Sequence, residues 1–203
     1  MKKKILITLS LLLIPFISIL LVITFRGVIM PTNEEIVEQL KEIECYKTEA
    51  HYIVKNSRVE ETEETIQYYS KEDGVRVEFG EELVKVFKDD EIEVTDKTLG
   101  SEYVVDKNMD TVHSLAFMKN ILSAPIIEGS MKEDQEEWGE VVYIQLDVEL
   151  FLENDHLNTA RVFIDKKKKE PIGVIVYDKE GNITVRIIYE NFEKIKEIDD
   201  NLL

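Results

Sequence analysis

Apolar and polar residues alternate with a period of two along most of this chain, beginning at Tyr46. In residues 46–55, YKTEAHYIVK, every second side chain falls on the same face of an extended backbone, which predicts a half-buried strand. Short polar turns separate the later runs of this kind. We therefore predict an antiparallel sheet with further strands in residues 65–70, 75–79, 83–87, 92–94, 103–105, 141–152, 158–165, 172–178 and 183–189.

Two helices are predicted beside the strands. The first begins with a capping box, in which Thr32 accepts from the N–H of Glu35 and the Glu35 carboxylate returns to the N–H of Thr32. Its apolar residues recur at intervals of three and four, and we expect it to end near Glu44. The second occupies residues 111–122 and is closed by Pro125. Strands and helices together predict an α+β fold.

The N-terminus predicts a membrane attachment. Residues 1–4 include three lysines, and the 21 residues of 5–25 carry no charge. At about 1.5 Å per residue, a helix over this run spans roughly 30 Å, the thickness of a bilayer core. Lysines favour the cytoplasmic side, so we predict a cytoplasmic tip (1–4), a transmembrane anchor (5–25) and an extracytoplasmic domain (31–203). A cleaved signal segment is the alternative for residues 5–25.

The domain outside the membrane is strongly acidic. The chain has 25 basic and 42 acidic residues; four of the bases and none of the acids lie at or before Arg26. The remaining 21 bases and 42 acids give a formal charge of −21 after that position. Such a surface repels phosphate backbones, so nucleic acid is excluded as a partner.

Few residues suggest reactive chemistry. His51, His113 and His156 are far apart in the sequence and have no second ligand at helical spacing, so we predict no metal site. Because Asp and Glu are plentiful, a site assembled only by the fold stays open as the alternative. The sequence has no Gly-rich phosphate loop, no G-x-S-x-G motif and no cysteine matched with a histidine. We therefore predict no catalytic residue and no cofactor. Cys45 is interpreted as a small apolar residue, and the lysines of 166–169 as a solvated hairpin turn.

Trp138 is the single tryptophan and precedes Gly139 at the entry to a predicted strand. A large aromatic residue at such a position either packs on the sheet or anchors a partner protein. We take Trp138 as the candidate partner-binding residue and leave packing on the sheet as the alternative.

The C-terminal residues 160–193 resemble the LolA/LolB-like lipoprotein-carrier family. The stretch ARVFIDKKKKEPIGVIVYDKEGNITVRIIYENFE places Asp165 after a strand, Asp178, Gly181 and Asn182 in a D-x-x-G-N turn, and the aromatic Phe192 at the end of the last strand. The resemblance implies a strongly curved antiparallel sheet, an incomplete β-barrel with helices on its concave side.

Within this fold the chain is similar to the GerS and GerS-related germination proteins of spore-forming anaerobes. That resemblance implies a non-catalytic accessory protein, needed for spore germination, that binds and activates a spore-cortex N-acetylmuramoyl-L-alanine amidase, a CwlD-like zinc enzyme, during muramic-δ-lactam formation. A homodimer is a further expectation. The germination lipoproteins carry a lipidated cysteine, whereas Cys45 lies 20 residues beyond Phe25. The alternatives are a lipid or lipoprotein carrier of the LolA type and, third, a hydrolase of envelope polymers.

Overall fold

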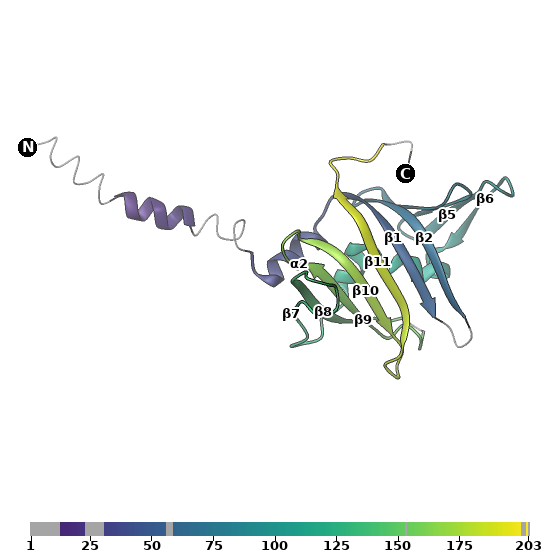
Figure 1. Cartoon of the computed structure of the whole chain (residues 1–203). Helices are drawn as coiled ribbons and strands as arrows, with labels where there is room; N and C mark the ends of the chain where they lie inside the picture. Colours follow the sequence, from purple (N-terminus) through teal and green to yellow (C-terminus); the bar gives the residue numbers. More distant parts are fainter. Residues whose placement is uncertain (1–12, 23–30, 56–58, 153, 200–201, 203) are drawn as a thin grey trace, which may run out of the picture. The chain divides into compact units, whose positions relative to one another are not determined.

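The computed structural model describes residues 13–22, 31–55, 59–152, 154–199 and 202. The chain divides into two compact units, Met1–Glu38 and Gln39–Leu203. In the first unit, residues 13–22 form a helix (Figure 1). The predicted 1–4 tip and the rest of the predicted 5–25 anchor lie outside the described residues. Of the helices in the described part, none combines the length and the apolar character needed to cross a membrane.

Helix α2 (Asn33–Lys41) begins with the predicted capping box. The N–H of Thr32 donates to Glu35 Oε2 at 2.8 Å, and the N–H of Glu35 donates to Thr32 Oγ1 at 3.2 Å. The helix ends before the predicted Glu44. The Glu44 carbonyl accepts a hydrogen bond from the N–H of Lys71 at 2.8 Å, and this residue lies in a bend just before the first strand.

An antiparallel sheet of 11 strands makes up most of the second unit, in the order β6-β5-β4-β3-β2-β1-β11-β10-β9-β8-β7. The first and last strands, β1 and β11, pair with each other and join its two halves. The strands are β1 (Cys45–Lys55), β2 (Glu60–Ser70), β3 (Gly74–Phe79), β4 (Leu83–Phe87), β5 (Glu91–Asp96), β6 (Ser101–Asp106), β7 (Lys132–Asp134), β8 (Tyr143–Glu149), β9 (Thr159–Asp165), β10 (Glu170–Tyr177) and β11 (Ile183–Lys194).

The sheet is not closed, because β6 and β7 each have a neighbour on one side only. Figure 1 shows it bending around short helices: η1 (Lys107–Asp110), α3 (Thr111–Ser114) and α4 (Met118–Ser123). The predicted α+β class, an open and curved antiparallel sheet with helices on its concave side, is confirmed.

Buried tyrosines of the central strands attach the helices to the inner face of the sheet. The Tyr52 hydroxyl donates to the carbonyl of His113 at 3.2 Å, and the Tyr189 hydroxyl donates to the carbonyl of Ala116 at 2.8 Å. The Tyr46 hydroxyl accepts from the N–H of a residue in α4 at 3.3 Å. Each of these three hydroxyls thereby has a partner, as burial of a polar group requires.

The predicted helix of residues 111–122 is in fact two helices. Phe117 has an extended backbone, with φ −79° and ψ 120°, and separates α3 from α4. Its ring is buried and packs edge-on against Phe87 of β4, with 5.0 Å between the ring centres. Burial of this aromatic ring requires the break, because a continuous helix would place the side chain differently.

Candidate functional site

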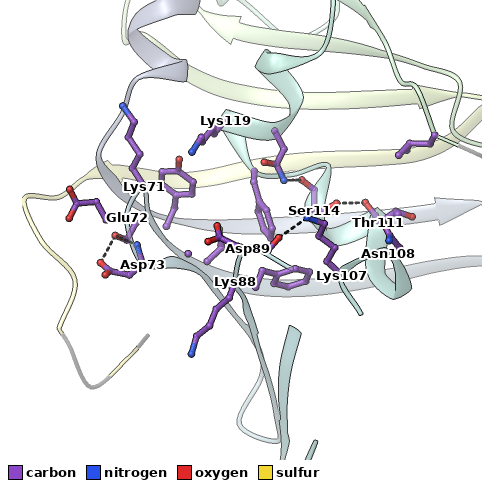
Figure 2. Close-up of a pocket in the computed structure, with 18 residues that line it drawn as sticks. Lys71, Glu72, Asp73, Lys88, Asp89, Lys107, Asn108, Thr111, Ser114 and Lys119 are labelled. Atoms are coloured by element: carbon purple, nitrogen blue, oxygen red, sulfur yellow. Dashed lines mark hydrogen bonds between the residues drawn. The ribbon is translucent and has the colours of Figure 1, made fainter. Parts of the chain in front are cut away.

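A pocket of about 590 Å³ opens where the β2–β3 and β4–β5 turns meet the segment from η1 to α4 (Figure 2). Phe87 and Phe117 contribute apolar surface to it. In Figure 2 the Lys88 side chain points away from Lys107. The lining also brings together lysines from four separate segments, Lys71, Lys88, Lys107 and Lys119.

Carboxylates already pair with three of these lysines. Lys71 Nζ lies 2.6 Å from Glu42 Oε2, and this hydrogen bond raises the pKa of Lys71. Lys88 and Lys107 pair with Glu93 and Asp90, at 2.6 and 2.9 Å. Among the residues that the structure describes, Lys119 alone of the four has no ion pair. The pocket is therefore electrostatically balanced and is not a strong site for an anion.

A second, apolar cavity of about 310 Å³ lies between α4 and the segment that follows β8. Leu115, Ile121 and Leu150 line it, and the neighbouring Phe151 is 78% exposed. Its size is at the lower limit for a small-molecule pocket.

His113 lies at the centre of a half-buried charged cluster behind the pocket. Its Nδ1 lies 2.6 Å from Asp110 Oδ1, and its Nε2 lies 2.7 Å from Glu63 Oε2. The second oxygen of Asp110 accepts from Lys85 Nζ, also at 2.6 Å. Both imidazole nitrogens are thus occupied by carboxylates, so the ring holds α3 to the sheet and is not available as a general base.

The pKa values of the cluster follow from this geometry. Burial favours the neutral form of Asp110, but the hydrogen bonds and charges of His113 and Lys85 outweigh it and lower the pKa of Asp110 to about 2. Burial likewise opposes the charged form of His113, but the hydrogen bonds to Asp110 and Glu63 raise its pKa above the ordinary 6.5. Each partner therefore favours the charged form of the other.

Trp138 lies on the outer face of the sheet. Its ring packs at 5.3 Å against that of Phe163, beside Tyr143 and Ile175, and it lies directly over Gly173. The indole is half-buried, and its Nε1 is buried with no hydrogen-bond partner among the described residues. This is the sheet-packing arrangement; a role for Trp138 in binding a partner stays a prediction.

The D-x-x-G-N stretch is a hairpin turn organised by one carboxylate. Asp178 Oδ1 accepts from the N–H groups of Glu180 and Asn182 at 2.9 and 2.8 Å, and Oδ2 accepts from the Asn182 amide at 2.9 Å. These hydrogen bonds, that of the Asn182 side chain first, lower the pKa of Asp178. Gly181 supplies the left-handed backbone, with φ 83°. The residues that carried the resemblance therefore shape the fold.

The other residues considered in the sequence do not line either of the two cavities. The lysine run forms the β9–β10 turn as predicted, and the Asp165 carboxylate accepts from two of its N–H groups. His156 is exposed, and Cys45 is half-buried at the start of β1. His51 lies between carboxylates of β2 and β11 on the outer face of the sheet.

Exposed apolar side chains lie on both faces and at both ends of β6, the edge strand of the sheet, a feature that the sequence interpretation missed. Tyr103 and Val104 on β6 are 50% and 57% exposed, and no residue of β6 is buried. Leu99 and Met109, just before and after the strand, are 77% and 76% exposed. The signal was the run Tyr-Val-Val, which departs from strict alternation. We call these four residues the β6 edge patch.

Several solved structures are similar to this chain. An uncharacterized conserved protein from Thermus thermophilus matches with a TM-score of 0.56 and 12% identity, over 83% of this chain and 91% of that one. A chain in the structure of the CwlD amidase from Clostridioides difficile in complex with the GerS lipoprotein matches with a TM-score of 0.46 and 20% identity. The match covers 80% of this chain and 95% of that one. A LolA superfamily protein from Nitrosomonas europaea matches with a TM-score of 0.41 and 10% identity, over 84% of this chain and 96% of that one.

The predicted open antiparallel sheet is confirmed by the structure, and an identity of 12% to the Thermus thermophilus protein establishes the fold alone. No functionally curated protein matches the sequence. The family described as "Sporulation protein YdcC-like" matches residues 2–203, which is nearly the whole chain. That description names a cellular process and no reaction. On this match, the chain belongs to the YdcC-like family of sporulation proteins.

Proposed function

We propose that this protein is a non-catalytic accessory protein of sporulation that binds and activates a spore-cortex amidase. The β6 edge patch is the observation that carries the proposal. Among the described residues β6 is the last strand of its sheet, so one side of its backbone has no strand partner. Tyr103 and Val104 expose apolar surface on it, between the exposed acids Glu102 and Asp106. An edge of this kind accepts an added strand from a partner protein.

Family membership supports a role in sporulation. The amidase is proposed from the resemblance to the GerS-related proteins in small size, acidity and a lysine-rich N-terminus. In this proposal residues 5–25 hold the domain outside the cytoplasmic membrane, where cortex is made. The formal charge of −21 after Arg26 favours a partner with a basic surface around its apolar contact.

A lipid carrier of the LolA type is the second candidate, and the apolar 310 Å³ cavity is the observation in its favour. A carrier needs a hollow inner face. Here the inner face is covered by α3 and α4, and Tyr46, Tyr52 and Tyr189 beneath them are buried. The partner-binding role accounts for both the filled inner face and the exposed edge.

The test is a binding and activity assay with the full-length chain in mild detergent and a purified spore-cortex amidase. The expected result is a complex of defined stoichiometry and higher release of stem peptides from cortex peptidoglycan than with amidase alone. Val104→Lys should abolish both effects, because it places a charge in the apolar contact. An exposed substitution of this kind changes folding stability by no more than about 0.5 kcal/mol.

Phe151→Lys is the matched control, because it also adds a lysine at an exposed apolar position but lies beside the second cavity. It should leave amidase binding unchanged. Loss of binding in Phe151→Lys with retention in Val104→Lys contradicts the edge assignment. If the wild-type chain ignores the amidase and retains lipid in a manner that depends on Phe151, the carrier function replaces the one proposed.

A further inference from the structure

Strands β1, β2 and β11 bring four ionisable side chains together on the outer face of the sheet. Glu49 and His51 are two residues apart on β1, so they point to the same side. Across the neighbouring strands Glu49 is paired with Glu190 of β11, and His51 with Glu64 of β2. The adjacent Ala50 and Tyr52 face the helices and are fully buried, which places the cluster on the opposite, solvent side.

The distance from His51 to Glu190 is too long for a hydrogen bond and close to that between metal ligands, whereas Glu64 lies at the outer limit of hydrogen-bond distance from the other ring nitrogen. His51 Nε2 lies 3.8 Å from Glu190 Oε2, and His51 Nδ1 lies 3.5 Å from Glu64 Oε1. One ligand atom from each of Glu49, His51 and Glu190 lies within 4.8 Å of the other two. Ligand atoms around a tetrahedral zinc ion are about 3.4 Å apart. Small rotations of the glutamate side chains suffice to bring the three ligand atoms to that spacing.

The imidazole has an unused nitrogen that faces this space. His51 Nε2 is buried and has no hydrogen-bond partner among the described residues. Buried polar atoms without a partner are uncommon. A proton on Nδ1, on the side of Glu64, leaves the Nε2 lone pair directed towards Glu190. A carboxylate behind the second nitrogen is the usual support of a histidine that binds a metal.

The two ligand carboxylates also form an unfavourable pair. Glu49 and Glu190 are directly opposite on adjacent antiparallel strands, where like charges destabilise the sheet. Within the described structure no lysine or arginine forms an ion pair with either of them. The register shifts beside this pair, and Asn191 takes a left-handed backbone with φ 52°. Such a bulge changes the direction of neighbouring side chains.

We propose that Glu49, His51 and Glu190 bind a zinc ion, with Glu64 orienting the imidazole. One imidazole and two carboxylates suit Zn²⁺, and water completes the coordination. The ion would cancel the repulsion between the two glutamates and link β1 to β11, the pair that joins the halves of the sheet. This site is separate from the β6 edge patch and does not depend on the amidase role.

Equilibrium dialysis of the full-length chain in detergent against Zn²⁺, with a large excess of Mg²⁺ to occupy non-specific carboxylates, tests the site. We expect one Zn²⁺ per chain and a higher thermal unfolding midpoint. Glu49→Gln/Glu190→Gln should lose both effects, and Glu64→Gln should weaken zinc binding by about 10- to 100-fold. His51→Gln should abolish binding.

Two variants serve as controls. Glu81→Gln/Glu82→Gln makes the same change in net charge in the exposed β3–β4 turn, and His156→Gln removes an exposed histidine. Both should bind zinc as the wild type does. Absence of saturable zinc binding to the wild type overturns the proposal. So does unchanged binding in Glu49→Gln/Glu190→Gln, a surface change that decides the matter even if His51→Gln fails to fold.

Discussion

The imidazole Nδ1 of His113 lies 2.6 Å from the Oδ1 atom of Asp110, three residues earlier in the chain. Both side chains are largely buried, with 13% and 12% of their surface exposed. Through Glu63 and Lys85 the same pair reaches β2 and β4. The position of α3 on the inner face therefore depends on a set of compensating charges, in addition to apolar packing.

Asp110→Asn should destabilise the fold strongly. The substitution leaves the Lys85 ammonium, which is 20% exposed, without its carboxylate and removes one of the two carboxylates that contact His113. Removing one member of a buried ion pair costs roughly 3 kcal/mol or more. Urea unfolding followed by circular dichroism measures the change in unfolding free energy.

Asp155→Asn is the matched control for that measurement. Asp155 pairs with Lys179, but the two side chains are 77% and 61% exposed, and solvent screens such a pair. No measurable loss of stability is expected here. Equal losses in the two variants would show that burial of the Asp110 pair has no energetic consequence.

The same cluster should make stability depend on pH at both ends of the range. The pKa of His113 is raised in the folded state, so its contribution is complete below 6.5 and is lost as pH rises through the folded value. The pKa of Asp110 is lowered to about 2, so its contribution is present above 3.8 and is lost as pH falls towards 2. Unfolding free energies measured against pH should therefore decline on both sides.

Variants separate the two limbs of this profile. His113→Gln should remove the decline above 6.5, because Gln does not titrate. The exposed residue His156 provides the comparison, since His156→Gln should retain both limbs. A wild-type profile that is flat above 6.5 contradicts the assigned role of His113.

Gly173→Ala should displace Trp138. A Cβ at this position would lie 2.8 Å from the indole Cη2 and 2.8 Å from the carbonyl oxygen of Ile187. Overpacking of this kind costs about 1–3 kcal/mol. Because Trp138 is the single tryptophan, its fluorescence emission should shift to longer wavelength as the ring becomes more hydrated.

Gly80→Ala distinguishes that local effect from general destabilisation. Gly80 has φ 60° with open space around its Cβ position, so alanine there strains the backbone without touching another side chain. Stability should fall while the Trp138 emission stays unchanged. A shift of the emission in Gly80→Ala as well would mean that it reports overall stability and not displacement of the indole.

Thr32→Ala should weaken the start of α2. It removes the hydroxyl that accepts from the N–H of Glu35, and loss of such a cap costs about 1 kcal/mol. Hydrogen exchange of the Glu35 amide should become faster. Glu35→Gln is the control, because glutamine still presents an oxygen to the N–H of Thr32. In this variant the amide of residue 35 should exchange as slowly as in the wild type.

Features that depend on neighbouring residues could be read from the sequence. The capping box of Thr32 and Glu35, the alternation in residues 46–55 and the lysine turn of 166–169 all appear as predicted. Each is determined by backbone geometry and hydrogen bonds within a few residues. For the same reason the α+β class could be predicted from the sequence, whereas the break in the predicted helix of residues 111–122 could not.

The tertiary structure decided which distant residues meet. Alternation says that Glu49 and His51 share a face, but only the pairing of β1 with β11 places Glu190 beside them. The break at Phe117 likewise depends on its contact with Phe87, 30 positions away in the sequence. A period of two fixes the face of each side chain, whereas strand order and register are set by packing of the whole sheet, which no local pattern contains.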